Sequence, residues 1–574
     1  MRGVAVVLTV LSALWTSGQA SETPVTFNGD IAPLLYQHCV PCHRPEGDAP
    51  FPLVTFDEVR RKADTLLEVI SDRTMPPWPP GPGNVRFQDD RHLAETEIAA
   101  FRHWKESGFP EGPPDAPPPP PEFEGVWQLG EPDLVVTPQV PILLPAEGPD
   151  RYRNLVIPVP RGTNRYVRAI QIRPGSRAVH HAFVLQDRHG HCRRLDAADP
   201  EPGFPGLDLP DGMESPGGHF LGWQPGRRAY ESPPGLAWVL PAGADLVIQL
   251  HLQPTGRAET ICPQIGLYFT NRPPEREFFK LDLSSLTMDI PPGDSRYVVE
   301  DSFVLPTDVS LIGLNPHCHY LGRDLQGLAV LPDGTTNVLL HIPRWNFNWQ
   351  GDYRLETPLS LPKGTRLQMR YVFDNSTNNP FNPNHPPRRV RYGVETQDEM
   401  AELWFQMLPA NAAGLASLRH AYGAKAIPEI VAYQEYRLRR NSKDAHAHGR
   451  LGVAKAQLGD IPAAMEHLRT AIQLDPNDYF TRFNLGALLR EKNERAAAER
   501  EFAAAVRLNP TDGRSQGALG ISLGERGRLA EAEAHLREAL RLDPQDEVAR
   551  STLAEVVRFR AVARQRKAAG SSAP

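Results

Sequence analysis

The sequence predicts a multidomain chain: a small all-α domain, two antiparallel β-sandwich (jelly-roll) domains, and an α-solenoid of helical repeats. The 574 residues suit three or four domains. Only six of the 59 prolines follow residue 410. Because proline is expelled from helix interiors, most of the front should be strands and loops and the back should be helical. A 34-residue repeat in that proline-poor back supports the solenoid.

The first 20 residues have the pattern of a secretory signal peptide. Arg2 precedes a largely apolar run from Val4 to Trp15, and small Gly18 and Ala20 stand before a cleavage point at Ser21. No later segment offers about 18 uninterrupted apolar residues, so we expect no transmembrane span. The protein should be periplasmic or secreted, and its net charge of −7 argues against broad nucleic-acid binding.

Residues 24–109 carry a haem-attachment motif, Cys39-Val-Pro-Cys42-His43. Two thiols three residues apart can form thioethers with the haem vinyl groups, and the next histidine then reaches the iron. A redox dithiol or half of a zinc site are the alternatives, but no second cysteine pair lies nearby. The motif therefore predicts one covalently bound c-type haem.

The flanking residues agree with a haem domain. A short helix over 27–38 should lead into the motif, and a closing helix is expected over 93–107. Met75, held in a proline turn, is the expected second iron ligand, since methionine opposite histidine is a usual pair in cytochromes c. Core filling is the alternative for Met75, and His92 and His103 are the rival ligands. This domain resembles a small cytochrome c.

A proline-rich linker over 110–124 follows. Eight of the twelve residues from Pro110 to Pro121 are proline. As polyproline II, this segment would reach about 35 Å and act as a stiff tether.

Residues 125–409 read as strands separated by proline and glycine. The expected strands include Tyr166–Ile172, Asp245–Gln253, Leu325–Leu331 and Leu367–Phe373. The turn Pro241-Ala-Gly243 is echoed 121 residues later by Pro362-Lys-Gly364, and each turn precedes an apolar strand. Two related sandwiches over 125–275 and 276–409 would explain this echo.

Five histidines on expected strands are candidate metal ligands. His180 and His181 are adjacent in a strand, so they can bind one ion only at a bulge or strand end. His251 lies on the face opposite a row of leucine and isoleucine, and such a lone histidine is usually structural. His317 and His319 are two apart, which places both imidazoles on one face.

Two other His-x-His pairs are weaker candidates. His446 and His448 fall in an expected helix, where such a spacing does not share a face. His189 and His191 lie among arginines, whose charge would oppose a metal ion.

Four stretches in this order resemble the type II copper monooxygenases, the family of peptidylglycine α-hydroxylating monooxygenase and dopamine β-hydroxylase. They are Val179-His180-His181-Ala182-Phe183, Leu250-His251-Leu252-Gln253-Pro254-Thr255-Gly256, His317-Cys318-His319-Tyr320-Leu321-Gly322-Arg323 and Asp398-Glu399-Met400. The resemblance implies two copper ions. The first would be held by His180, His181 and His251 and would supply electrons. The second would be held by His317, His319 and Met400, where dioxygen is activated. Imidazole suits both copper oxidation states, and a thioether favours Cu(I). Core packing is the alternative for Met400.

The resemblance implies an oxidoreductase acting on paired donors, which inserts one oxygen atom of dioxygen into a C–H bond of an organic substrate that the sequence does not name. Ascorbate or a redox protein would be the reductant, and the tethered haem is the expected electron donor. The first alternative is a periplasmic haem and copper electron carrier or copper-binding protein scaffolded by its repeats. The second is that the repeats are the purpose and the metal domains act as sensors.

The remaining cysteines lie in the β-rich part. Cys318 should point away from its neighbouring histidines, because successive strand residues face opposite sides. Cys192 and Cys262 could form a disulfide within the first sandwich.

Residues 414–566 strongly resemble tetratricopeptide repeats. Leu451-Gly452, Leu485-Gly486 and Leu519-Gly520 recur every 34 residues, and Ala464, Ala498 and Ala532 keep the same phase. Three repeats span about 444–545, with a helix expected before them over 414–441 and a capping helix after them over 547–566. Such arrays usually bind protein segments, so a protein partner is expected; a packing platform for the oxygenase is the alternative.

Overall fold

The computed structural model describes residues 24–45, 47, 49–113, 127–160, 162–188, 190–206, 213–543 and 546–570. The predicted signal peptide and all but the first four residues of the predicted linker lie outside these ranges. The chain divides into two compact units. Unit 1 holds residues up to Pro77 together with Arg91–Glu122, and unit 2 holds Trp78–Asp90 and everything from Phe123 onward. No helix among the described residues is both long enough and apolar enough to cross a bilayer.

The described part of unit 1 is helical. Its elements are a π-helical turn η1 (Phe27–Ile31) and helices α1 (Ala32–His38), α2 (Phe56–Arg61), α3 (Ala63–Ser71) and α4 (Glu95–Glu106). The helices expected over 27–38 and 93–107 are thus present. Buried Trp104 on α4 packs against Phe27 and Phe56, and its indole N–H donates to the carbonyl of Pro110. The first residue of the predicted linker therefore closes this helical unit.

The first half of the β-rich region consists of two antiparallel sheets that share one apolar core. One sheet runs β1 (Leu134–Val136), β13 (Gln264–Thr270), β4 (Arg165–Arg173) and β10 (Trp238–Leu240), with β9 (Tyr230–Glu231) paired to β4. The other runs β6 (Phe204–Pro205), β3 (Arg151–Pro158), β11 (Asp245–Leu252), β5 (Val179–Asp187) and β7 (Met213–Glu214), with β8 (Gly222–Trp223) paired to β5. The short strands β2 (Ile142–Leu144) and β12 (Glu259–Ile261) pair separately, and helix α5 (His191–Ala198) follows β5.

The second half repeats this construction around its own core. One sheet runs β14 (Phe279–Ser284), β23 (Glu402–Pro409), β17 (Val309–His317) and β20 (Tyr353–Leu361). The other runs β16 (Tyr297–Val304), β21 (Arg366–Phe373), β18 (Gly322–Val330) and β19 (Thr336–Ile342). The short strands β15 (Asp289–Ile290) and β22 (Val390–Arg391) form a separate pair. Strands β19 and β20 are therefore the edge strands of two different sheets.

The internal echo noticed in the sequence corresponds to two equivalent turns. Gly243 has φ of 84° and Gly364 has φ of 87°, a left-handed conformation that favours glycine. The turns lead into β11 and β21, and each of these strands lies inside its sheet with a partner on both sides.

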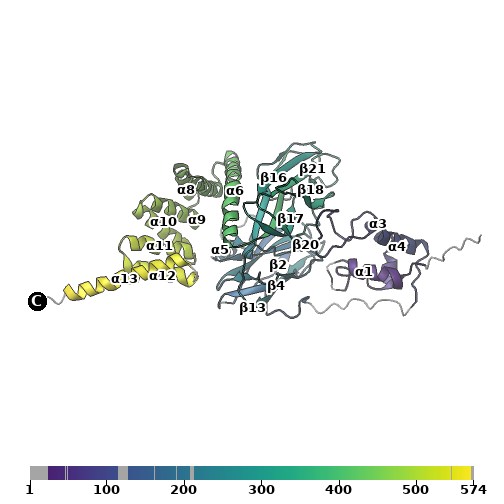
Figure 1. The fold of residues 1–574 in the computed structure, drawn as a ribbon, viewed down its shortest axis with the longest axis horizontal. Coiled ribbons are helices and arrows are strands. Elements are labelled where there is room, and N and C mark those ends of the chain that lie inside the picture. The colour runs from purple at the N-terminus through teal and green to yellow at the C-terminus, as the bar shows by residue number, and fades with distance from the viewer. Residues whose placement is uncertain are drawn as a thin grey trace, which may run out of the picture. The chain divides into compact units, whose positions relative to one another are not determined.

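A long helix, α6 (Ala412–Arg440), connects the second sandwich to the repeats (Figure 1). Leu418 on this helix is fully buried against the core of the second sandwich. Three helix pairs and a final helix follow: α7 (Ala445–Gln457), α8 (Ile461–Leu474), α9 (Tyr479–Glu491), α10 (Arg495–Leu508), α11 (Gly513–Glu525), α12 (Leu529–Leu542) and α13 (Glu547–Gly570). Ala464, Ala498 and Ala532 are fully buried where the helices of each pair cross, as the repeat phase predicts.

Candidate metal centre

Three histidines of the first sandwich converge on one point. The Nδ1 atom of His180 lies 3.1 Å from Nδ1 of His251 and 3.3 Å from Nδ1 of His181. One ligand atom from each of the three can be chosen so that all lie within 4.8 Å of one another. Three nitrogens at about 2.0 Å from one tetrahedral ion would lie about 3.3 Å apart, so the first histidine group (His180, His181 and His251) has the dimensions of a metal site.

A β-bulge allows the two adjacent histidines to share this site. On β11, His251 pairs with His181 and the next residue, Leu252, pairs with Val179. His180 is therefore the extra residue of the bulge, which disturbs the strand alternation that would otherwise send it to the opposite face. The structure confirms the bulge that the adjacent pair requires.

His251 is held in a fixed orientation by its surroundings. Its Nε2–H donates to the Asp150 carboxylate at 2.9 Å, which leaves the lone pair on Nδ1 facing the other histidines. Gln253 donates to the same carboxylate oxygen at 3.1 Å, and the Tyr152 ring stacks on the imidazole at 4.3 Å. His251 is fully buried on one face of β11. The opposite face of the strand packs into the apolar core through Leu246, Ile248, Leu250 and Leu252.

The electrostatics keep His180 and His181 in the form that binds a metal. Burial, with a further contribution from neighbouring His251, lowers the pKa of His180 to about 4. The same causes lower the pKa of His181 well below its usual value. A metal binds only the neutral imidazole, so both side chains are ready to bind a cation at neutral pH without first losing a proton.

The second histidine group consists of His317 and His319. His317 ends β17, and the two ring centroids lie 5.3 Å apart. The Nδ1–H of His317 donates to Oε1 of Gln350 at 2.5 Å, and that of His319 donates to the carbonyl of Asp398 at 3.1 Å. In each ring the hydrogen bond is made at Nδ1, so the lone pair of Nε2 is available as a ligand. Burial lowers the pKa of His319 to about 3, so this ring too is neutral.

The Asp398-Glu399-Met400 stretch lies beside this second group. The fully buried Glu399 carboxylate accepts from the backbone N–H groups of His319, Leu321 and Met400. Burial nevertheless raises the pKa of Glu399 to about 8. Met400 is half-buried and lies outside the apolar core of the second sandwich, in contrast to Ala401, which belongs to it. These positions argue against core packing for Met400.

Cys318 points away from both histidines, as predicted. Its side chain is fully buried in the core of the second sandwich, and burial raises the pKa of its thiol well above the usual value. A Cβ added at Gly322 would lie 2.2 Å from its sulfur, so the thiol occupies the space that glycine leaves.

A loop between β19 and β20, residues 343–352, reaches both histidine groups. The Phe347 ring lies 6.0 Å from the ring of His180 and 5.6 Å from that of His319, and it is 3% exposed. The same loop carries Gln350, the partner of His317, and Trp345, whose indole N–H donates to the His319 carbonyl. Phe347 thus contacts a histidine of each group.

Four residues that shape these groups were missed by the sequence reasoning: Asp150, Phe347, Gln350 and Glu399. Asp150 and His251 are 101 positions apart, and Gln350 and His317 are 33 apart. Only Glu399 carried a signal, since it stands within the Asp-Glu-Met stretch.

Unit 1 places the Cys-x-x-Cys-His residues at the end of α1. Cys39 follows the helix directly, and neither Cys39 nor Cys42 forms a disulfide. The Nδ1–H of His43 donates to the carbonyl of Phe51 at 3.0 Å, which leaves Nε2 available as a ligand atom. Met75 lies in the turn after α3, half-buried and outside the apolar core cluster of this unit. The rival ligands His92 and His103 are exposed.

Cys192 and Cys262 do not form a disulfide in this structure. Cys192 is buried in a small apolar cluster with Val156, Phe204 and Val247. Cys262 is exposed, and its sulfur lies 3.3 Å from the hydroxyl of Thr137.

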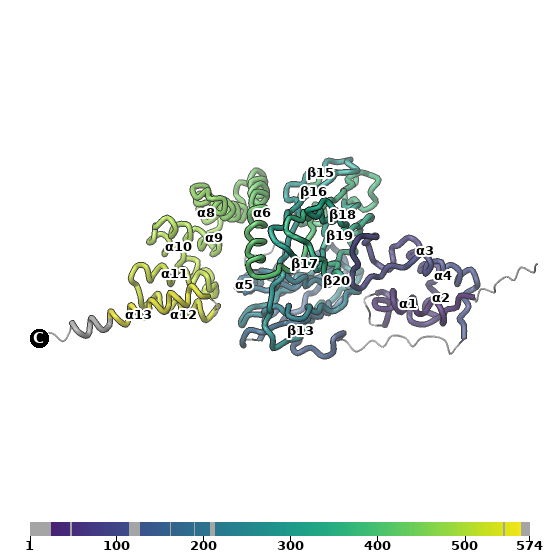
Figure 2. The backbone as a smooth tube through the Cα atoms, viewed as in Figure 1, coloured from purple at the N-terminus to yellow at the C-terminus, as the bar shows by residue number. Residues whose placement is uncertain are grey.

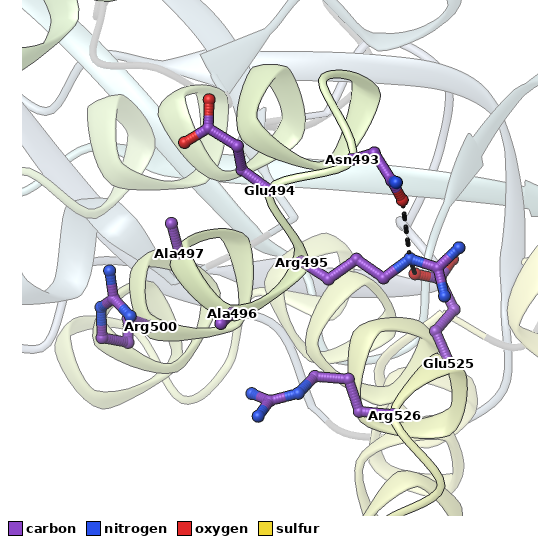
Figure 3. Close-up of a pocket in the computed structure, with 8 residues that line it drawn as sticks. All are labelled: Asn493, Glu494, Arg495, Ala496, Ala497, Arg500, Glu525 and Arg526. Carbon is purple, nitrogen blue, oxygen red and sulfur yellow. Dashed lines mark hydrogen bonds and ion pairs between the residues drawn. The ribbon is translucent and has the colours of Figure 1, made fainter.

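The helical repeats carry an open pocket of about 850 Å³ at the turns that join α9 to α10 and α11 to α12 (Figure 3). It is lined by Asn493, Glu494, Arg495, Ala496, Ala497, Arg500, Glu525 and Arg526. Arg495 donates to Asn493 at 2.9 Å, and Arg526 donates to Glu499 at 2.6 Å. The lining is polar and of mixed charge, which suits contact with a protein surface better than an apolar ligand.

Comparisons with known proteins identify the helical part. The tetratricopeptide-repeat family model matches residues 445–478 and 483–547. Cellulose synthase operon protein C of Escherichia coli (strain K12) is 38% identical over 84 residues, which is 15% of this chain and 7% of the relative. The C-terminal helices are tetratricopeptide repeats, an architecture that serves as a protein-interaction scaffold.

Two solved structures are also similar to part of the chain. One is the "MamA RS-1 ArsTM double mutant", with 23% identity, coverage of 25% of this chain and 80% of that chain, and a TM-score of 0.22. The other is the "First TPR of Spaghetti (RPAP3) bound to HSP90 peptide SRMEEVD", with 21% identity, coverage of 21% and 96%, and a TM-score of 0.20.

Proposed function

We propose that this protein is an exported copper-dependent monooxygenase that inserts one atom of dioxygen into a C–H bond of an organic substrate. A c-type haem in unit 1 would be its electron donor, and ascorbate or a redox protein would be the ultimate reductant. The observation that carries the proposal is the convergence of three imidazole Nδ1 atoms at a β-bulge. One ligand atom from each of these histidines lies within 4.8 Å of the others, which suits a single shared ion.

The residues fit copper in both groups. His180, His181 and His251 would hold one ion, and His317, His319 and Met400 would hold the other. Bound copper would supply one-electron transfer at the first group and dioxygen activation at the second. The chain's own contribution is orientation: Asp150 fixes His251, while Gln350 and the Asp398 carbonyl fix His317 and His319. Phe347 packs against His180 of the first group and His319 of the second.

The residues of unit 1 fit a covalently attached haem. Two reduced cysteines stand directly after α1, and the tautomer of His43 that the Phe51 carbonyl selects presents Nε2. Bound haem would supply single electrons. Met75, half-buried and outside the core cluster, would be the second protein ligand to the iron.

The repeats would bring a protein partner to this enzyme. The alternative proposal, a haem and copper electron carrier or copper-binding protein scaffolded by its repeats, shares all of these residues. It differs only in that no oxygen is inserted into a substrate.

Metal and oxygen measurements on the full chain test the proposal. Purified protein should bind two copper ions, and His251→Ala should reduce this to one. His341→Ala is the matched control, because His341 also bonds a carboxylate, that of Asp324 at 2.8 Å, but lies outside both groups. Oxygen uptake coupled to a hydroxylated product, screened over organic compounds with ascorbate as reductant, separates the monooxygenase from the carrier. Saturation with one copper ion, or preference for zinc, would refute the two-site assignment.

Haem attachment is tested separately. Protein made together with the cytochrome maturation machinery should retain haem through acid–organic extraction, and replacing both Cys39 and Cys42 with alanine should abolish this retention. Extractable haem in the unsubstituted protein would remove the haem from the proposal without affecting the copper groups.

A further inference from the structure

A segment from the N-terminal part of the chain is built into the second sandwich. Residues 78–90, which we call the strap, belong to unit 2, although residues up to 77 and from 91 to 122 belong to unit 1. The chain thus leaves unit 1 for thirteen residues and then returns. No sequence pattern predicts this excursion. Figure 2 shows the dark tube of this region beside β19 and β20.

The strap binds the edge strands of both sheets through its backbone. On β19, Gly81 N–H donates to the carbonyl of His341 at 2.8 Å and Asn84 N–H to that of Val338 at 3.0 Å. On β20, Gln88 N–H donates to the carbonyl of Arg354 at 2.8 Å, and Phe87 forms an antiparallel bridge with Leu355. The strap therefore pairs with backbone groups that a sheet edge would otherwise leave open.

Aromatic packing holds the strap in place. The rings of Trp78 and Phe87 lie 5.6 Å and 5.5 Å from the ring of Tyr353, the first residue of β20. Phe87 is 8% exposed and is a member of the second sandwich core. The Asn84 side chain adds a bond, accepting from Val338 N–H at 2.6 Å.

These contacts hold the two strands that flank loop 343–352, the loop that contacts both histidine groups. Loop 343–352 begins directly after β19 and ends directly before β20, so His341 and Tyr353 are its two anchors. Because β19 and β20 belong to different sheets, no ladder between them fixes the loop. The strap bonds to both strands and so links them.

We propose that the strap is a positioning element for the metal groups: it holds loop 343–352 so that Gln350 meets His317 and Phe347 lies between the two histidine groups. The proposal rests on the proposed function for its importance, but not for its test. The two ends of the strap continue into unit 1 at Pro77 and Arg91. Met75, the expected haem ligand, stands three residues before Trp78.

Hydrogen exchange on the full-length protein without added metal tests this inference. Phe87→Ala should raise amide exchange in peptides covering 343–352 at least tenfold. Phe303→Ala is the matched control, since Phe303 is a similarly buried phenylalanine of the same core, on β16, and touches Tyr422 instead of the strap. This control should leave the loop unchanged. Equal exchange of the loop in Phe87→Ala and unsubstituted protein, or an equal rise in Phe303→Ala, would overturn the inference.

A milder variant and a copper titration complete the test. Asn84→Ala removes one bond to β19 and should raise loop exchange in the same direction if Phe87→Ala does not fold. With copper, Phe87→Ala should weaken binding about tenfold at the second group, where Gln350 of the loop bonds to His317, and less at the first group, whose ligands all lie on β5 and β11. Equal weakening at both groups would contradict a positioning role. If neither group binds copper, the proposed function fails, and the exchange result still decides whether the strap positions the loop.

Discussion

His251 shows how a single hydrogen bond selects the chemistry of a side chain. An imidazole has two nitrogens, and whichever one donates leaves the other with a lone pair. The Asp150 carboxylate accepts a hydrogen bond from Nε2–H, so Nδ1 keeps its lone pair and lies 3.1 Å from Nδ1 of His180. The Asp398 and Gln350 oxygens act on His319 and His317 in the opposite sense and leave Nε2 available. The two groups therefore leave different ring nitrogens available as ligand atoms.

This arrangement predicts a defined effect of Asp150. Asp150→Asn keeps the shape of the side chain but removes the charge that orients His251, so copper affinity at the first group should fall by about 10- to 100-fold. A copper titration against a competing chelator measures this change. Asp324→Asn is the control. The Asp324 carboxylate bonds to His341 at 2.8 Å, close to the 2.9 Å between Asp150 and His251, but it lies outside both groups, so this change should leave the copper affinity unchanged. An unaltered affinity in Asp150→Asn would show that the orientation of His251 does not depend on this carboxylate.

At the scale of elements, the two helices of each repeat pair cross at a glycine, whose lack of a side chain lets the helices approach closely. A Cβ added at Gly452 would lie 2.7 Å from Leu468, one at Gly486 would lie 2.8 Å from Phe502, and one at Gly520 would lie 2.7 Å from Leu536. The same close approach thus recurs in all three pairs. This explains why the Leu-Gly dipeptide keeps a strict 34-residue period: closer packing of the helices requires the glycine.

Substitution of these glycines should therefore destabilise the repeats. Gly486→Ala forces overpacking against Phe502 and should lower the free energy of unfolding of the solenoid by about 1–3 kcal/mol. Gly423→Ala on α6 is the control, because nothing lies within 4 Å of its added Cβ. That change should stabilise the helix by up to about 1 kcal/mol. Urea unfolding followed by helical circular dichroism compares the two variants; a neutral Gly486→Ala would mean that the crossing can relax.

At the scale of the whole molecule, α6 belongs to two parts at once. Its first half packs on the second sandwich, where Tyr422 meets Phe279 and Phe303 and Lys425 pairs with Asp301 at 2.6 Å. Its second half leads into the repeats, where Lys455 of α7 pairs with Glu435 at 3.0 Å. The repeats also touch the first sandwich, since the Arg194 guanidinium of α5 lies 4.9 Å from the Tyr479 ring centroid. The interaction scaffold is thus attached to the β-rich region by packing as well as by the chain.

Truncations on either side of α6 should behave differently. A chain ending at residue 441 keeps α6 packed on the apolar surface of the second sandwich and should remain folded. The first group should then bind copper as in the full chain. A chain ending at residue 410 exposes the surface that Leu418 and Tyr422 cover and should aggregate. Solubility, limited proteolysis and copper content distinguish the two. Equal solubility of both chains would show that α6 is not needed to complete the second sandwich.

The sequence by itself determined whatever depends on short-range spacing. The 34-residue phase, the turns at Gly243 and Gly364, the shared face of His317 and His319, and the need for either a bulge or a strand end at His180 and His181 could all be predicted. Each follows from the geometry of one helix pair, one turn or one strand, so neighbouring residues carry the whole signal.

Only the tertiary structure decided which distant residues complete the groups. Asp150 reaches His251, Phe347 lies between His180 and His319, and residues 78–90 join the edges of two sheets. These residues come from loops and edge strands, where no periodicity marks a partner. Their proximity arises because sheet pairing brings together segments that are far apart in the chain, and the packing of the whole sandwich, rather than any local pattern, sets which loops meet.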